Sequence, residues 1–146
     1  MLQSQENGRR NMKLKGRTVN PGKAEAEAIV TSTPFSFLGE LEPSTGKVPS
    51  PSHELFGKNL AGKIFVCPTG KGSSGGPGVA FVAKLNDNMP AAMIVGEVEP
   101  VLAAGILTAD IPAVDKLDQD PCEVIETGDY VIVDADNGIV EVIKKS

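Results

Sequence analysis

The chain has 146 residues, of which 40% are hydrophobic, 23% are charged and 4% are aromatic, and it contains no tryptophan. This length suits one compact domain that buries a core without disulfides, and the composition predicts an aliphatic, alanine-rich interior. The formal net charge of -5 argues against binding to a nucleic-acid backbone, which requires a clustered basic surface.

The cysteines and the one histidine form no metal-binding pattern. Cys67 ends an apolar run and Cys122 follows a proline, so their spacing matches neither CxxC nor another metal-ligand motif. A self-contained zinc or iron–sulfur site is therefore not expected. The chain lacks an apolar signal region and a long apolar run, which predicts a cytoplasmic protein with reduced thiols and no membrane contact.

The N-terminal part predicts a polar arm followed by two strands. Residues 1–12 are polar and aperiodic, so we expect a flexible arm there, and residues 13–146 form the one domain. Apolar and polar residues alternate over 13–19 and again over 24–31, on either side of the turn signal Asn20-Pro21-Gly22. This pattern predicts a β-hairpin with one solvated face. A short Ala/Glu helix is the alternative, which the absence of an apolar stripe at helical spacing disfavours.

Residues 33–57 predict an ordered loop without regular structure. The segment holds four prolines and three glycines together with Phe35, Phe37, Leu38 and Leu41. We expect its aromatic residues to attach it to the core. Such a loop is either a functional or interface segment or a passive connection.

A Gly/Ser-rich loop separates a strand from a helix in the middle of the chain. Residues 64–67 are apolar and predict a buried strand, and Pro77 suits the first turn of a helix that ends near residues 86–88. The residues expected on the buried side of that helix are Val79, Phe81, Val82, Ala83 and Leu85. The loop between the two elements places N–H groups and hydroxyls at a helix N-terminus, where oxyanions and small polar substrates are held.

The remaining segments predict a layered fold. A strand over 91–96, a helix after Pro100 and a strand over 111–114 continue a βαβαβ succession with parallel pairing. Two alternating runs from Gly128 onward meet at Asn137-Gly138, which predicts a C-terminal hairpin. The expected fold class is α/β, a layered β/β/α domain with terminal β-hairpins around a βαβαβ segment.

The Gly/Ser loop matches none of the common catalytic motifs. Gly72 follows Lys71 where a P-loop requires Ser or Thr, and the spacing around Ser73 and Ser74 fits neither GxGxxG nor GxSxG. The loop offers two hydroxyls and one cation, and a serine needs a neighbouring base, cation or oriented dipole to transfer a proton. The alternative is a glycine-rich turn without chemistry.

Other polar residues are expected to have structural roles. His53 is predicted to be an exposed loop residue, and a phosphohistidine role is disfavoured because no glycines flank it at a helix start. The acidic residues after apolar strands are Glu97, Glu99 and Asp110, of which the first two suit a helix start. Asp129, Asp134 and Asp136 are assigned to turns, and Cys67 to a buried strand end.

The order of these segments resembles the small subunit, or swivelling domain, of the aconitase X dehydratases. The resemblance covers nearly all of the chain after residue 12. The residues that carry it are Gly16-Arg17, Gly22 to Ala28, Phe35-Ser36-Phe37-Leu38-Gly39, Leu60-Ala61-Gly62-Lys63, Gly70-Lys71-Gly72-Ser73 and Gly128 to Val133.

The resemblance implies a β/β/α swivelling domain that closes over a separate large subunit. That subunit carries the cysteines of an iron–sulfur cluster, so this chain would bind no cofactor itself. The heteromeric enzyme would be a hydro-lyase that removes water from a small hydroxy acid. By resemblance Ser73 is the catalytic proton acceptor, and the substrate-binding residues are Lys71, Gly72, Ser74 and Gly75.

Two positions differ from the family pattern. The loop continues as Gly75-Gly76-Pro77 instead of further serines, and Glu40 stands where a second glycine is common. The resemblance implies cis-3-hydroxy-L-proline as substrate, as in bacterial members, or 5-phosphomevalonate, as in archaeal ones. We predict hydroxyproline, because the loop and the N-terminal extension differ from the compact archaeal form. A non-catalytic binding or regulatory module that docks a partner through residues 33–57 is the alternative of another class.

Overall fold

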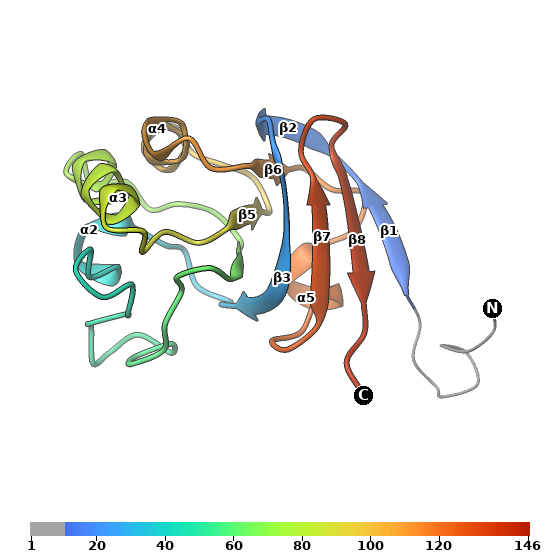
Figure 1. Cartoon of the computed structure of the whole chain (residues 1–146), viewed down its shortest axis with the longest axis horizontal. Helices are drawn as coiled ribbons and strands as arrows, with labels where there is room; N and C mark the ends of the chain where they lie inside the picture. The colour runs from blue at the N-terminus through green and yellow to red at the C-terminus, as the bar shows by residue number, and fades with distance from the viewer. Residues whose placement is uncertain (1–10) are drawn as a thin grey trace.

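The computed structural model describes residues 11–146 and arranges them in three layers (Figure 1). The strands are β1 (Met12–Lys15), β2 (Arg17–Asn20), β3 (Lys23–Val30), β4 (Ile64–Cys67), β5 (Ala92–Val95), β6 (Ala113–Asp115), β7 (Tyr130–Asp134) and β8 (Ile139–Ile143). The helices are α2 (Phe37–Glu40), α3 (Gly76–Leu85), α4 (Pro100–Ala109) and α5 (Pro121–Val124). The strand order is β1-β8-β7-β3-β4-β5-β6-β2.

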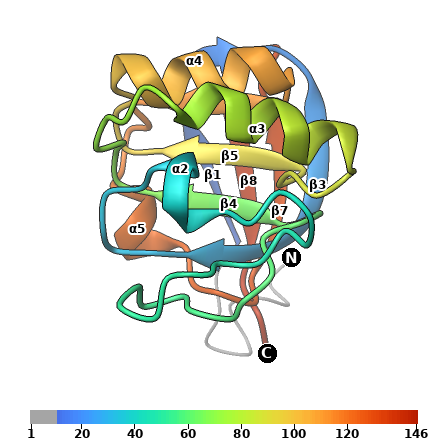
Figure 2. The ribbon, with the colours of Figure 1, turned by 90° about the vertical axis from the view of Figure 1, so that its left-hand side faces the viewer.

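The parallel half of the sheet carries the helical layer. Strands β3, β4, β5 and β6 pair in parallel, and α3 and α4 connect them as crossovers over one face (Figure 2). Between this face and the helices lies a core that includes Phe65, Met93, Leu102 and Ile106, all buried. The predicted βαβαβ segment is confirmed.

The antiparallel half forms the other sheet layer. The first part of β3 pairs with β7, while its last residues pair with β4, so β3 belongs to both halves. Strand β8 lies between β7 and β1, which confirms the C-terminal hairpin. A second core, with Ile94, Val131 and Val140 among its residues, fills the space between the two halves. The β/β/α fold class is confirmed.

The predicted N-terminal hairpin is wrong, although its strands exist. β1 pairs with β8 and β2 pairs with β6, so neither contacts β3 through ladder hydrogen bonds. Gly16 lies between them at a corner that joins the two layers, where a Cβ atom would lie 2.5 Å from the carbonyl oxygen of Asp115. The turn at residues 20–22 is tied to distant segments instead, since Asn20 Nδ2 donates to Ile111 O and Gly22 N donates to Asp136 Oδ1.

The predicted buried side of α3 is wrong in three positions. Ala83 is buried as expected, as is Ala80, but Phe81, Val82 and Leu85 are 48%, 44% and 69% exposed. The small residues allow α3 to approach α4 closely, because a Cβ on Gly105 of α4 would already lie 3.7 Å from the Cβ of Ala80. Close packing through small residues therefore directs the large apolar ones outward.

Asp129 is more than a turn residue. Its side chain is fully buried and accepts hydrogen bonds from Lys144 Nζ at 2.6 Å, Glu126 N at 2.8 Å and Lys145 N at 3.0 Å. The turn assignment holds for Asp134, whose carboxylate accepts from the backbone and side chain of Asn137.

The expected N-terminal arm falls mostly on residues 1–10, which lie outside the described residues. The strand β1 begins at Met12, one residue before the expected domain boundary. Over residues 11–146, no helix is long and apolar enough to cross a membrane.

Candidate active site

The Gly/Ser loop lies at the carboxyl edge of the parallel strands. It leaves β4 after Cys67 and enters α3 at Gly76. Phe35 N donates to Thr69 O at 2.9 Å and Lys71 N donates to Phe35 O at 3.2 Å, which ties the start of the loop to the segment after β3. Gly96, after β5, donates its N–H to Cys67 O at 3.0 Å. Ligand sites of parallel sheets gather at this edge.

The backbone of the loop has a conformation that few residue types adopt. Gly72 and Ser73 both have φ of 87°. For serine the left-handed region costs about 1–2 kcal/mol. Gly70 contacts the start of α4, since a Cβ there would overlap with Glu99 Oε1. The loop thus passes over the N-terminus of α4 before it turns outward at Gly72.

The loop presents a group of backbone donors next to two hydroxyls. Within residues 11–146, the N–H groups of residues 72–75 make no hydrogen bond to protein acceptors, whereas Gly76 N donates to Ser73 O. Ser73 and Ser74 are exposed. N–H groups at the positive end of a helix favour bound anions. The loop therefore has the chemistry of an anion site with a serine at its rim.

Lys71 forms an ion pair that sequence patterns did not predict. Its Nζ lies 2.5 Å from Glu40 Oε2, and Ser36 N donates to the other oxygen, Glu40 Oε1, at 2.9 Å. The Glu40 side chain is 11% exposed and that of Lys71 is 48% exposed. Part of the lysine side chain is therefore open to solvent beside the loop. From the sequence, Glu40 was notable only as a departure from the family pattern.

Ser36 lies beneath the same loop. Its hydroxyl is buried and has no hydrogen-bond partner within the described part of the chain. It lines a narrow crevice with Phe37, Gly72, Gly76 and Glu99. The carboxylate of Glu99 accepts from Val101 N and Leu102 N and so caps α4, which confirms its predicted helix-start role.

A second cation lies at this edge of the sheet. Arg17 donates from Nε and Nη2 to the two carboxylate oxygens of Asp115, at 2.9 and 2.8 Å. Asp115 ends β6, is fully buried and also accepts from Val98 N. The ion pair fixes the guanidinium, whose side chain remains 53% exposed. Sequence patterns had pointed to Arg17 only as part of the family motif.

The segment 33–57 is attached to the core as predicted. Phe35, Phe37 and Leu41 are buried, while Leu38 is 47% exposed. Glu54 accepts from the Thr31 hydroxyl and from Ser32 N, and these two hydrogen bonds lower the pKa of the Glu54 carboxyl. The segment therefore has a defined conformation beside the loop.

His53 is buried, so its predicted exposure is wrong. Its Nδ1 accepts from Leu55 N at 3.0 Å, and its ring meets that of Phe35 edge to face. No side chain of residues 11–146 hydrogen-bonds to the Ser73 hydroxyl. Residues 11–146 thus supply a hydroxyl and N–H donors, but no base in contact with that hydroxyl.

The described residues contain no set of ligands for a metal. Among residues 11–146, no group of three or more His, Cys, Asp or Glu side chains could hold a metal ion. Cys67 is buried as predicted, and burial raises the pKa of its thiol. Burial also raises the pKa of Cys122 to about 11.

Comparison with known proteins gives consistent matches over most of the chain. The family model described as aconitase X swivel domain matches residues 13–142. The phosphomevalonate dehydratase small subunit of Methanosarcina mazei is 43% identical over 134 residues, which cover 92% of this chain and 93% of that protein. The small subunit of the same name from Thermococcus kodakarensis is 47% identical over 133 residues, covering 91% and 98%.

Two solved structures share the fold. The crystal structure of Thermococcus kodakaraensis aconitase X in its holo-form superposes with a TM-score of 0.86 and 46% identity, covering 91% of this chain and 99% of that one. The solution NMR structure of a UPF0107 protein has a TM-score of 0.83 and 40% identity, covering 91% and 100%. The layered arrangement is thus shared with solved proteins over most of the chain.

Proposed function

Because this chain belongs to the aconitase X swivel domain family, we propose that it is the small subunit of a dehydratase that acts on 5-phosphomevalonate. The coarser statement, that it is a small subunit of an aconitase X-type hydro-lyase with a large subunit as its partner, follows from the family match and from the relatives. The substrate is the proposed step. It replaces our preference for hydroxyproline, which none of the relatives reported above supports by its name.

The observation that carries the substrate proposal is the donor-rich loop with Lys71 beside it. 5-Phosphomevalonate has a carboxylate at one end and a phosphate at the other. The free N–H groups of residues 72–75 and the half-exposed ammonium of Lys71 offer two positive regions close together. Hydroxyproline carries one carboxylate and a cationic amine, so it offers these donors one anionic group where 5-phosphomevalonate offers two. The donors therefore suit the substrate with two anionic groups better.

We assign the proton-transfer step to Ser73. Loss of water from a 3-hydroxy acid breaks the C–H bond next to the carboxylate and the C–O bond of the hydroxyl, and the electron pair of the former becomes the double bond. In the proposal a base of the large subunit first takes the Ser73 hydroxyl proton, and the resulting Ser73 oxygen accepts the proton from carbon. The hydroxide that leaves takes a proton back from the large subunit and departs as water. The N–H groups of the loop hold the carboxylate and stabilise negative charge on the Ser73 oxygen, at the positive end of α3.

The rest of the site is assigned to the large subunit. Because residues 11–146 contain no group of side chains that could hold a metal ion, we place the iron–sulfur cluster in that subunit. The same division explains why none of residues 11–146 places a base in contact with the Ser73 hydroxyl.

A substrate comparison tests the proposal. The complex of this chain with its large subunit, purified without oxygen, is incubated with 5-phosphomevalonate, mevalonate or cis-3-hydroxy-L-proline, and products are identified by mass spectrometry. We expect dehydration of 5-phosphomevalonate and little of mevalonate, which lacks the phosphate. Faster turnover of hydroxyproline would show that the proposed substrate is wrong. Full activity of the large subunit alone would instead support a regulatory role for this chain.

A further inference from the structure

The outward side of α3 is apolar along its whole length. Gly78, Phe81, Val82 and Leu85 follow the spacing i, i+3, i+4, i+7, which places them on one face of a helix, and all four are exposed. In the ten residues of α3, Lys84 is the one charged side chain. Figure 2 shows this helix in front of the parallel strands, on the outside of the molecule. A surface helix normally turns polar residues to water, so this face needs a partner.

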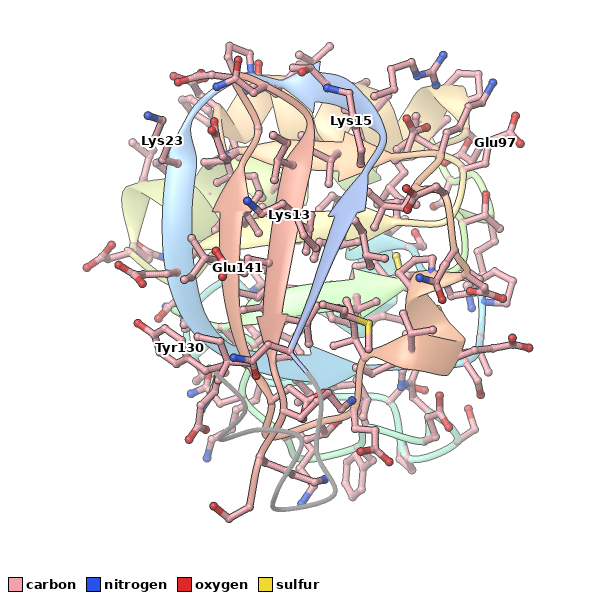
Figure 3. The ribbon with its side chains drawn as sticks, turned by 90° about the vertical axis from the view of Figure 1, so that its right-hand side faces the viewer. Lys13, Lys15, Lys23, Glu97, Tyr130 and Glu141 are labelled. Carbon is pink, nitrogen blue, oxygen red and sulfur yellow. The ribbon has the colours of Figure 1, made fainter. Side chains whose placement is uncertain are left out.

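The opposite side of the molecule has the usual polar character. Figure 3 shows Lys13, Lys15, Lys23 and Glu141 on the outer face of the antiparallel strands. Lys13 lies opposite Glu141 in the register of β1 and β8, a favourable cross-strand charge pair. Among the described residues of this face, Tyr130 is the one large and mainly apolar side chain that is strongly exposed, at 40%. Elsewhere among the described residues the strongly exposed large apolar side chains are Leu38, Phe56, Leu107 and Tyr130, no two of them on one helix or strand, whereas α3 carries three.

The apolar surface is continuous with the Gly/Ser loop. Leu38 of α2 lies against Gly75, since a Cβ on that glycine would be 3.1 Å from Leu38 Cδ2. Leu38 is itself 47% exposed. The surface formed by Leu38, Gly78, Phe81, Val82 and Leu85, here called the α3 face, thus begins beside the residues assigned to substrate.

We propose that the α3 face is the surface on which the large subunit docks. The inference rests on the proposed function, in which the large subunit completes the site around Ser73. A partner that reaches the exposed Ser73 must cover the surface next to the loop, and the α3 face is the apolar surface there. The backbone at Gly39 and Gly78 is accessible to a partner, because a Cβ on either residue would meet no atom within 4 Å. The main chain of the partner can therefore approach closely.

A second copy of this chain is a poorer occupant. Two copies joined through their α3 faces would bring two Gly/Ser loops together. Each copy would then add another serine and more N–H donors, and the described residues of neither copy supply a base in contact with Ser73 or a metal site. The large subunit is the partner that supplies what the loop lacks.

Gly78→Arg tests docking of the large subunit without destabilising the fold of the free chain. The position is helical and sterically open, and arginine favours helix over glycine, so the free chain should unfold at the same temperature as wild type or higher. Leu85→Arg places a charge at the most exposed apolar residue of the face. The matched controls are Gly78→Ala, which adds little bulk, and Tyr130→Arg, which adds the same charge on the opposite sheet face.

Each variant is titrated into the purified large subunit by calorimetry, and its thermal unfolding is measured alone. We expect Gly78→Arg and Leu85→Arg each to weaken binding about thirtyfold or more, the size of an interface hot spot, and both controls to stay within about threefold of wild type. Binding of both arginine variants within threefold of wild type would overturn the proposal. So would failure of the wild-type chain to bind, or a homodimer that these variants dissociate while large-subunit binding is unchanged.

The two proposals can fail separately. If the α3 variants lose binding as expected and the wild-type complex dehydrates none of the tested acids, the docking surface stands and the proposed substrate fails. If the complex dehydrates 5-phosphomevalonate and the α3 variants bind normally, the proposed function stands and the docking surface is wrong.

Discussion

The ammonium of Lys71 lies 2.5 Å from the carboxylate of Glu40, a residue 31 positions earlier in the chain. The other oxygen of that carboxylate accepts the N–H of Ser36. One side chain therefore connects the segment after β3 to the loop after β4. Lys71 retains further N–H donors, so the contact orients the cation beside the loop without using all of its hydrogen bonds.

Lys71→Met tests the role of this cation in substrate binding. Loss of the charge should raise KM for 5-phosphomevalonate about tenfold to a hundredfold, because charge-assisted hydrogen bonds to an anion contribute about 1.5–3 kcal/mol. Steady-state kinetics of the complex measures this change in KM. Glu40→Gln should have a smaller effect, about threefold to tenfold in kcat/KM, because it acts by orienting Lys71.

The double variant distinguishes orientation from an independent role of Glu40. If Glu40 acts through Lys71, Glu40→Gln combined with Lys71→Met should be no worse than Lys71→Met alone. Effects that add in full would show that Glu40 contributes in another way. Lys47→Met, which removes an exposed charge from the segment 33–57, is the control for loss of a lysine and should leave KM unchanged.

Ser73→Ala tests the proposed proton acceptor. Removal of the hydroxyl should lower kcat about a thousandfold to ten-thousandfold with KM within a few-fold, since proton-transfer groups contribute up to about 10⁴. Ser74→Ala removes the adjacent exposed hydroxyl and is the matched control, with an expected loss below about tenfold. If Ser73→Ala retains near wild-type turnover, another group accepts the proton.

Ser73→Gly should make the chain more stable and less active. Ser73 has φ of 87°, a conformation that glycine adopts without the steric cost paid by serine. The free energy of unfolding of the isolated chain should rise by up to about 1 kcal/mol, since the greater entropy of glycine in the unfolded chain offsets part of the gain. Chemical denaturation measures this change. Lower stability than wild type would mean that the serine backbone is not strained.

Strand and helix positions could be predicted from residue patterns, but the pairing of distant segments could not. The alternation over residues 13–19 and 24–31 correctly indicated strands. Nothing in it showed that Gly16 would be a corner between layers, because that depends on the carbonyl of Asp115, far along the chain. The hairpin at Asn137-Gly138 was predictable since its turn chemistry is local.

The candidate site shows the same division between local and distant information. The loop over residues 70–75 was recognised from its own composition and from family motifs. Glu40 and Arg17 owe their positions to Lys71 and Asp115, which lie far from them in the sequence. The outward face of α3 was not predicted, because apolar residues at helical spacing indicate a buried side. A helix face that is buried only when a partner binds has the same pattern.

Asp129 should make the stability of the chain sensitive to acid. Burial by itself raises the pKa of its carboxyl, but the hydrogen bonds from Lys144, Glu126 and Lys145 outweigh it and the pKa lies below its ordinary value. The folded state therefore favours the carboxylate. Its contribution is present above the unfolded pKa of about 3.9 and is lost as the pH falls through the lower pKa of the folded state.

Asp129→Asn removes this contribution. At pH 7 the variant should lose about 3 kcal/mol of stability, because Lys144 is left without its buried carboxylate partner. The difference between wild type and variant should shrink as the pH falls below about 4, where the wild-type carboxyl also becomes neutral. Denaturation curves at several pH values measure this difference in stability. Asp136→Asn, at an exposed position, is the control. A difference that stays constant from pH 7 to acid would show that Asp129 contributes through packing and not through its charge.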